Sequence, residues 1–219
     1  MTGIQIIQEI EKTEISIKQF NSNSFDTNTL KSSYSDWTSK DVLAHINEWI
    51  KYSANKLYCI KSNKVLAELG DYHEFNKLTY ERTNSIKSND IIMEISKSIS
   101  QYKKIVQMYN DKDLLSKDFP TGFSFELWRY MIMDGSIHPN LHLMFHYLKN
   151  GQYKELIEII DNTKIVFLHF SGNDMNVYDF SDFVEEKSAF FIRLRELKIF
   201  SQNDSFISQI VNLNIKNNS

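Results

Sequence analysis

The chain has 219 residues, which is enough for one domain with an appended segment and for a large hydrophobic core. Its net charge of −3 arises from 25 basic and 28 acidic residues, a balance that gives no general electrostatic reason to bind nucleic acid. The single cysteine excludes an intramolecular disulfide, no apolar run approaches the roughly 18 residues of a membrane span, and no signal peptide is visible, so we expect a soluble cytoplasmic protein that binds no membrane.

The composition predicts helices, because two prolines and six glycines are too few for the many turns of a β-protein. Apolar spacing predicts a first helix over about residues 3–20, ended by the polar run 21–33. Thr38, followed three residues later by Asp41, is typical of a helix start. The apolar stripe of this second helix includes His45, which we therefore expect to point inward.

The middle of the chain predicts three further segments. A helix is expected from Asp71 to about Ile86, and the next begins near Ser88 with the strongest stripe of the chain: Ile92, Ile95, Ile99, Tyr102, Val106 and Tyr109. Residues 110–122 read as a loop, and residues 123–150 read as helical around Pro139. Two interpretations of that proline stay open. Either it bends one continuous helix, or Ser136 caps a new helix whose first turn tolerates it.

The C-terminal part predicts a helix from Tyr153 to about Phe170, a break at 171–174, a helix over 180–199, a short amphipathic piece near 204–213 and a frayed tail. We therefore predict an all-α protein: an up-and-down four-helix bundle over residues 1–151, with a helical appendage over 152–219 packed on it. The appendage could cover the bundle, widen a dimer contact or close a cleft, and the sequence does not rank these roles.

Three of the six histidines lie close together, at positions 138, 142 and 146. Residues four apart stack on one helix face, so His138 and His142 can aim two imidazoles at one point. With His45 as a third ligand, such a pair can hold Zn²⁺, Ni²⁺ or Fe²⁺ and leave a coordination position open, which is typical of catalytic sites. His146 is expected to pack beside the site, although its spacing also allows a 142/146 pair.

The segment from Trp37 to Trp49, with Asp41-Val42 and His45 inside it, resembles the second-helix signature of the DinB/YfiT-like family of metalloenzymes, in particular the branch of the ClbS/DfsB proteins. The Phe75-Asn76 pair with Tyr80 is similar to a weaker signature of that branch. The pair His138 and His142 resembles the remainder of the three-histidine metal set of the family. The resemblance covers roughly residues 1–151.

That resemblance implies an up-and-down four-helix bundle with a divalent metal near one end of its core, in a family whose members commonly dimerise. Activities within the family include thiol S-transfer, mycothiol-dependent isomerisation and hydrolysis of a reactive cyclopropane. The implied function is a metal-dependent transferase or hydrolase that transfers a low-molecular-weight thiol to a small electrophile or hydrolyses it. The alternative is a non-catalytic helical protein that binds a small molecule or dimerises.

The resemblance and the spacing together assign candidate residues. The expected metal ligands are His45, His138 and His142, and the expected pocket residues are Trp49, Asn76, Tyr80 and His146. No catalytic acid or base is assigned. Asp41 and Glu48 are either outer partners of an imidazole N–H or solvated residues of the helix surface.

Overall fold

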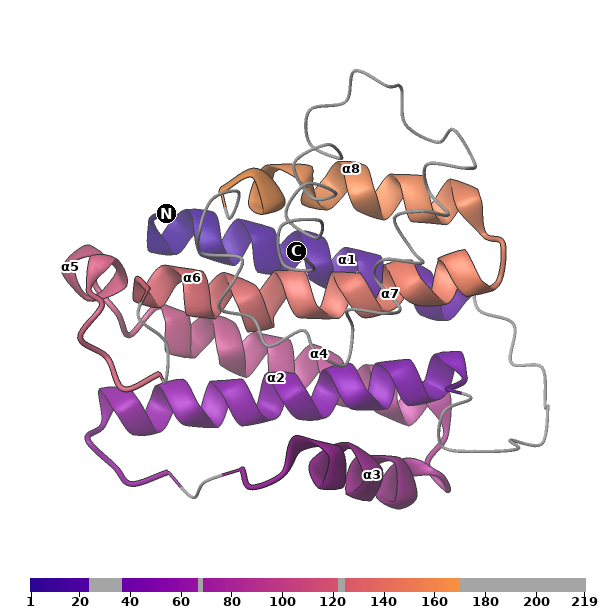
Figure 1. The fold of residues 1–219 in the computed structure, drawn as a ribbon, viewed down its shortest axis with the longest axis horizontal. Coiled ribbons are helices and arrows are strands. Elements are labelled where there is room, and N and C mark those ends of the chain that lie inside the picture. Colours follow the sequence, from indigo (N-terminus) through magenta and orange to yellow (C-terminus); the bar gives the residue numbers. More distant parts are fainter. Residues whose placement is uncertain (24–36, 67–68, 122–124, 170–219) are drawn as a thin grey trace, which may run out of the picture. The chain divides into compact units, whose positions relative to one another are not determined.

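The computed structural model describes residues 1–23, 37–66, 69–121 and 125–169 (Figure 1). Within these ranges every regular element is a helix and no strand occurs, so the predicted all-α class is confirmed. The elements are α1 (Gly3–Asn23), α2 (Ser39–Lys61), α3 (Tyr72–Thr83), α4 (Ser88–Val106), α5 (Asp111–Leu115), α6 (Leu127–Ile132), the π-helical segment η1 (Met133–Ile137), α7 (His138–Lys149) and α8 (Tyr153–His169). No helix in these ranges is both long and apolar enough to cross a bilayer.

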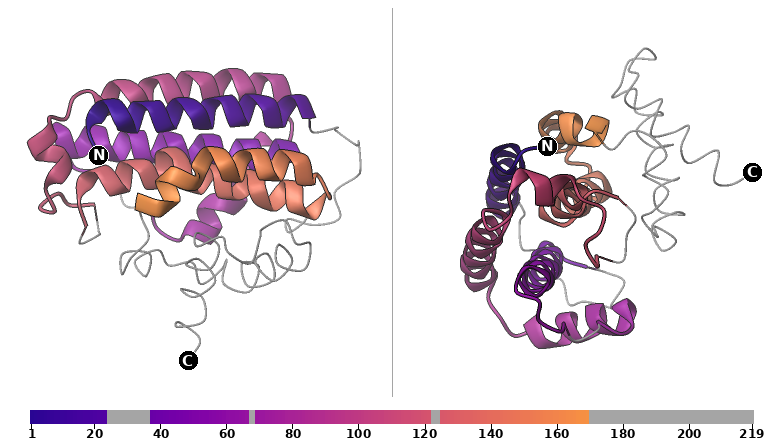
Figure 2. Two further views of the ribbon diagram at one scale, coloured as in Figure 1. Left: turned by 90° about the horizontal axis from the view of Figure 1, so that it is seen from above. Right: turned by 90° about the vertical axis from the view of Figure 1, so that its left-hand side faces the viewer.

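The chain divides into two compact units, residues 1–146 and 147–219. In the first unit, α4 packs against both α1 and α2. Both α6 and η1 contact α1, and η1 also contacts α2. Helix α3 lies on the outer side of α2 when the helices are seen end-on (Figure 2). The side chains enclosed between the helices are mostly aliphatic and include Ile10, Ile17, Ile46, Ile50, Ile95 and Ile99.

The second unit is described up to the end of α8. This helix follows Gly151, whose φ of +69° is a left-handed conformation that favours glycine. The helix predicted from Tyr153 is therefore present. The predicted break at 171–174, the helices over 180–199 and 204–213 and the C-terminal tail lie outside the described residues. The predicted boundary between residues 151 and 152 stays a prediction.

Local capping residues set the start of α2 as expected from the sequence. The Thr38 side chain accepts a hydrogen bond from the Asp41 backbone N–H, and the Asp41 carboxylate accepts one from the Thr38 backbone N–H at 2.8 Å. These reciprocal bonds satisfy backbone donors that a helix N-terminus leaves without an intrahelical partner. Asp71 caps α3 in a similar way, because its carboxylate accepts from the backbone N–H groups of His73 and Glu74.

Two predicted boundaries are wrong. Residues 110–122 are not a continuous loop, because Asn110 and Asp113 form a capping box that starts the short helix α5. The helix expected from residue 123 begins only at Leu127. The buried stripe of α4 begins at Ile91, one residue before the predicted first position, and Ile92 is only half-buried.

The chain continues helically through Pro139, as the first interpretation expected, but it does so by a π-helical turn that the sequence did not predict. Helix α6 passes directly into the π-helical turn η1, where the backbone N–H of His138 bonds to the carbonyl of Met133, five residues back. Ser136 lies inside this turn, so the second interpretation, in which Ser136 caps a new helix, is wrong. The Ser136 hydroxyl instead accepts a hydrogen bond from Thr13 of α1. Pro139 follows as the second residue of α7. The widened turn absorbs the change in hydrogen-bond register that a mid-helix proline requires.

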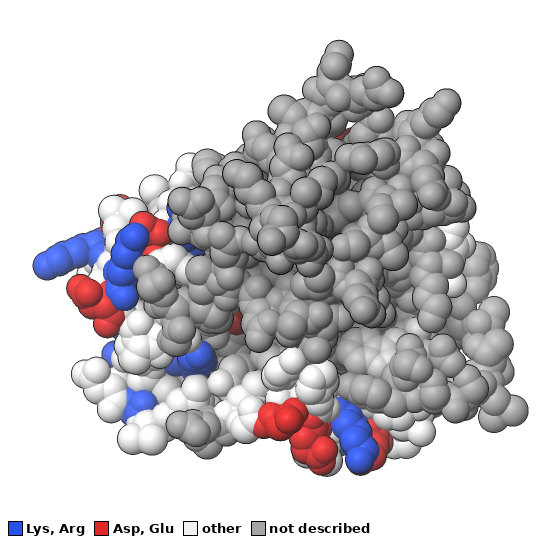
Figure 3. Space-filling view, in the orientation of Figure 1, with Lys and Arg blue, Asp and Glu red and all other residues white. Residues whose placement is uncertain are grey.

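Charged side chains are intermixed on the surface. On the face shown in Figure 3, described acidic and basic residues lie beside one another. Pairs such as Lys18–Glu14 at 2.7 Å and Lys103–Glu14 at 3.3 Å link neighbouring positions. Ion pairs at the protein surface typically contribute at most about 1 kcal/mol each.

Candidate metal centre

Three histidines from two helices meet inside the first unit. His45 comes from α2, while His138 and His142 come from successive turns of α7. The Nε2 atom of His138 lies 3.2 Å from Nε2 of His45 and 2.9 Å from Nε2 of His142. One ligand atom from each residue can be chosen so that all lie within 4.8 Å of one another, and the group could hold a metal ion. His45 and His142 are buried and His138 is half-buried.

The spacing of the His138 Nε2 atom from its two neighbours suits a first-row divalent metal. Zn–N bonds are about 2.0–2.1 Å long, so two imidazole nitrogens on one ion lie about 3.3–3.4 Å apart at tetrahedral angles and about 2.8–3.0 Å apart at right angles. The two measured separations fall at or between these values. Nitrogen atoms that face one another this closely need a proton or a cation between them, because their lone pairs otherwise repel.

Aromatic rings surround the three imidazoles. The Trp37 ring centroid lies 4.7 Å from that of His45 and stacks over His142 at 6.0 Å. Trp49 lies 6.1 Å from His45 and 5.7 Å from His138. Both tryptophans are half-buried, so the histidines sit in a mainly apolar enclosure with indole walls.

The pocket residues predicted from α3 take different places. The Trp49 indole N–H donates to Oδ1 of Asn76 at 2.9 Å, which brings Asn76 next to the aromatic wall, and Phe75 packs edge-on against the same indole at 5.3 Å. Tyr80 is half-buried and lies one turn beyond Asn76 on α3. His146 is outside the group of three and packs edge-on against Phe20 at 4.8 Å. Roles for these residues in a pocket remain predictions.

Burial keeps the three imidazoles neutral at neutral pH. Loss of solvation lowers the pKa of His138 to about 4. The pKa values of His45 and His142 lie well below the usual value for the same reason, and the neighbouring histidines lower them further. For His45, an interaction with the Asn76 side chain opposes part of the shift. Neutral imidazole is the form that binds metals.

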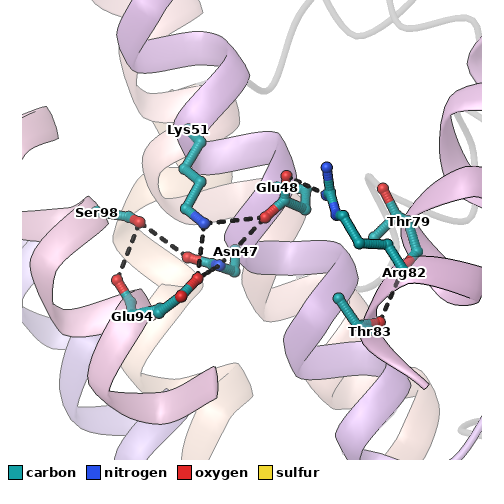
Figure 4. Close-up of polar contacts among 8 residues, drawn as sticks. All are labelled: Asn47, Glu48, Lys51, Thr79, Arg82, Thr83, Glu94 and Ser98. Carbon is teal, nitrogen blue, oxygen red and sulfur yellow. Dashed lines mark hydrogen bonds and ion pairs between the residues drawn. The ribbon is translucent and has the colours of Figure 1, made fainter. Parts of the chain in front are cut away.

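Glu48 and Asp41 are engaged away from the imidazoles. Glu48 Oε1 accepts from Lys51 at 3.0 Å and Glu48 Oε2 pairs with Arg82 of α3, so its carboxylate belongs to the network drawn in Figure 4. In that network Lys51 also reaches Glu94 of α4 at 2.8 Å. The Asp41 carboxylate accepts the two Thr38 hydrogen bonds at the start of α2. Of the two interpretations of Glu48, the surface role fits these contacts.

Two features near the histidines were missed from the sequence. The ring of Trp37 is one, although its place just before a capped helix could have suggested it. The other is Asp134, a buried acid in η1 that accepts a 2.8 Å hydrogen bond from Ser53 of α2.

Comparisons of the sequence with family models and with curated proteins, and of the chain with solved structures, give no match.

Proposed function

We propose that this protein is a metal-dependent enzyme whose divalent ion is held by His45, His138 and His142. The reaction we propose is the transfer of a low-molecular-weight thiol to a small electrophilic molecule, or hydrolysis of that molecule. The ion would be Zn²⁺, Ni²⁺ or Fe²⁺, and we assign the helices of the first unit to a four-helix bundle of the DinB/YfiT-like type.

The single observation that carries the proposal is the convergence of three neutral Nε2 atoms from two helices. A structural zinc site is usually closed by four protein ligands, whereas three leave a position for water or substrate. A metal held by the three imidazoles can lower the pKa of a water bound at the open position or bind a thiolate there, which are the needs of hydrolysis and of thiol transfer respectively. The indole walls of Trp37 and Trp49 favour a substrate with an apolar part.

Metal analysis of protein purified without a histidine tag tests the proposal. We expect about one divalent ion per chain in the wild type and loss of that ion in His142→Ala, because two imidazoles hold a first-row metal far more weakly than three. His146→Ala is the matched control, since it removes an imidazole one turn along the same helix and should keep the metal. A screen of thiols with model electrophiles then tests for turnover.

Absence of stoichiometric metal in correctly folded wild-type protein would overturn the metal assignment. Metal that is lost in both His142→Ala and His146→Ala but retained in His138→Ala would show that the pair 142/146 is the ligating one. Bound metal without turnover in the screen would favour a binding protein over an enzyme.

A further inference from the structure

A group of polar side chains lies beside the candidate metal centre, one turn further along the same helices. Along α2 and along the segment α6–η1–α7, side chains meet in successive layers: Trp49 lies beside His138, and Ser53, four residues later on α2, bonds to Asp134, four residues earlier on the facing segment. Four residues correspond to about one helical turn, so the two layers lie about 5–6 Å apart. The Asp134 carboxylate therefore lies about one turn from the layer of His138 and about two turns from that of His45 and His142.

Asp134 is a buried acid whose described neighbours include uncharged hydrogen-bond donors and a lysine. Ser53 donates to it, and Tyr130 is hydrogen-bonded to it, an interaction that raises the pKa of that phenol. Tyr102, whose pKa the same carboxylate raises, donates to the Met131 carbonyl at 3.0 Å. The lysine is Lys56, which lies 5.2 Å over the Tyr130 ring. Burial lowers the pKa of Lys56, and the Asp134 carboxylate opposes part of that shift.

We propose that Asp134 supplies the counter-charge of the metal centre and makes it selective for divalent over monovalent cations. This inference rests on the metal ligation proposed above. Three neutral imidazoles leave the charge of a divalent ion uncompensated in an apolar enclosure, and an uncompensated buried charge is costly. A fixed carboxylate one turn beyond His138 offsets that cost without occupying a coordination position, so the open position stays available.

The other acids near the site are bound to different partners. Glu48 pairs with Lys51 and Arg82 at the α2–α3 surface, and Asp41 caps α2. Of the acids described around the histidines, Asp134 is thus the one that lies on the segment carrying His138, inside the core and facing α2. Coulomb energy scales with the charge of the cation, so Asp134 should act twice as strongly on a divalent as on a monovalent ion.

Metal affinities of the full-length, tag-free chain for Zn²⁺ and for Ag⁺ test this inference. In Asp134→Asn, which keeps the size of the side chain, we expect Zn²⁺ affinity to fall by about 100-fold and Ag⁺ affinity by about 10-fold, the square relation that loss of one charge predicts. Ser53→Ala is the matched control, because it removes a hydrogen bond to Asp134 but keeps the charge. It should change the two affinities little and by the same factor.

Equal losses for Zn²⁺ and Ag⁺ in Asp134→Asn, or no loss, would overturn the inference while leaving the metal ligation intact. Wild-type protein that binds neither ion would instead overturn the ligation, and the inference with it. Lys56→Met keeps the inference testable if Asp134→Asn does not fold. Removing this cation should increase metal affinity, whereas removing the carboxylate should reduce it. Lys56→Met should raise Zn²⁺ affinity by a larger factor than Ag⁺ affinity, and a fall in that ratio would contradict the assignment.

Discussion

Single residues decide the chemistry of the histidine cluster, and the sequence predicted the set for a physical reason. The spacing of His138 and His142 places both rings on one helix face, and the apolar stripe around His45 requires that ring to point inward. Ring packing is different. The contacts of Trp37 depend on side-chain rotamers and on how two distant helices meet, so spacing alone could not reveal that its indole covers both His45 and His142.

Acid should destabilise the metal-free protein through these imidazoles. A histidine whose pKa falls from its usual 6.5 to about 4 on folding, as for His138, binds fewer protons when folded than when unfolded. Its contribution to stability is complete above the unfolded pKa and is lost as the pH falls from about 6.5 toward 4, which amounts to as much as about 3 kcal/mol. Urea unfolding of metal-free protein between pH 7 and pH 4.5 measures this slope.

The His138→Gln variant should show a shallower dependence of unfolding free energy on pH than the wild type. His73 is exposed on α3, so His73→Gln is the control and should keep the wild-type slope. Identical slopes in all three proteins would contradict the shift of the His138 pKa.

Among the elements, α2 and α3, whose first turns are capped locally, were predicted, whereas α5, also capped locally, was overlooked and the π-helical turn η1 could not be predicted. The capping residues Thr38 and Asp71 act within their own turns, so sequence reveals them. The π-helical turn η1 depends on contacts with α1. The Thr13 hydroxyl of α1 donates to the Ser136 hydroxyl in η1, and the Asn140 side chain of α7 donates to the Thr13 hydroxyl at 2.9 Å. A linear pattern of apolar residues contains no such information.

Gly135 shows how tightly η1 is packed, and Gly135→Ala tests it. A Cβ atom there would lie 3.0 Å from Cγ1 of Ile10 and 3.0 Å from Cε1 of Tyr102, closer than ordinary contact. We expect a loss of about 1–3 kcal/mol in the free energy of unfolding, because the surrounding core must shift. Gly3→Ala is the control, since its nearest neighbour would be a Leu114 atom at 3.8 Å, and thermal unfolding should separate the two variants. Equal stability of both would contradict tight packing at η1.

For the whole molecule, metal binding should appear as added stability. A ligand that binds only the folded chain stabilises it by about 2.7 kcal/mol at a concentration 100 times its dissociation constant. We therefore expect Zn²⁺ or Ni²⁺ to raise the midpoint of thermal unfolding of the wild type and of His146→Ala, and to leave His142→Ala unchanged. A metal-induced rise of the same size in His142→Ala would point to ions bound elsewhere on the chain.

The separation of His45 and His138 by 93 positions has a kinetic consequence. An ion that joins them closes a long loop. The contacts formed early in folding rarely offset the entropic cost of closing so long a loop. The imidazoles can therefore converge only after α2 and α7 have docked. A bound ion would then slow unfolding and leave the rate of folding nearly unchanged.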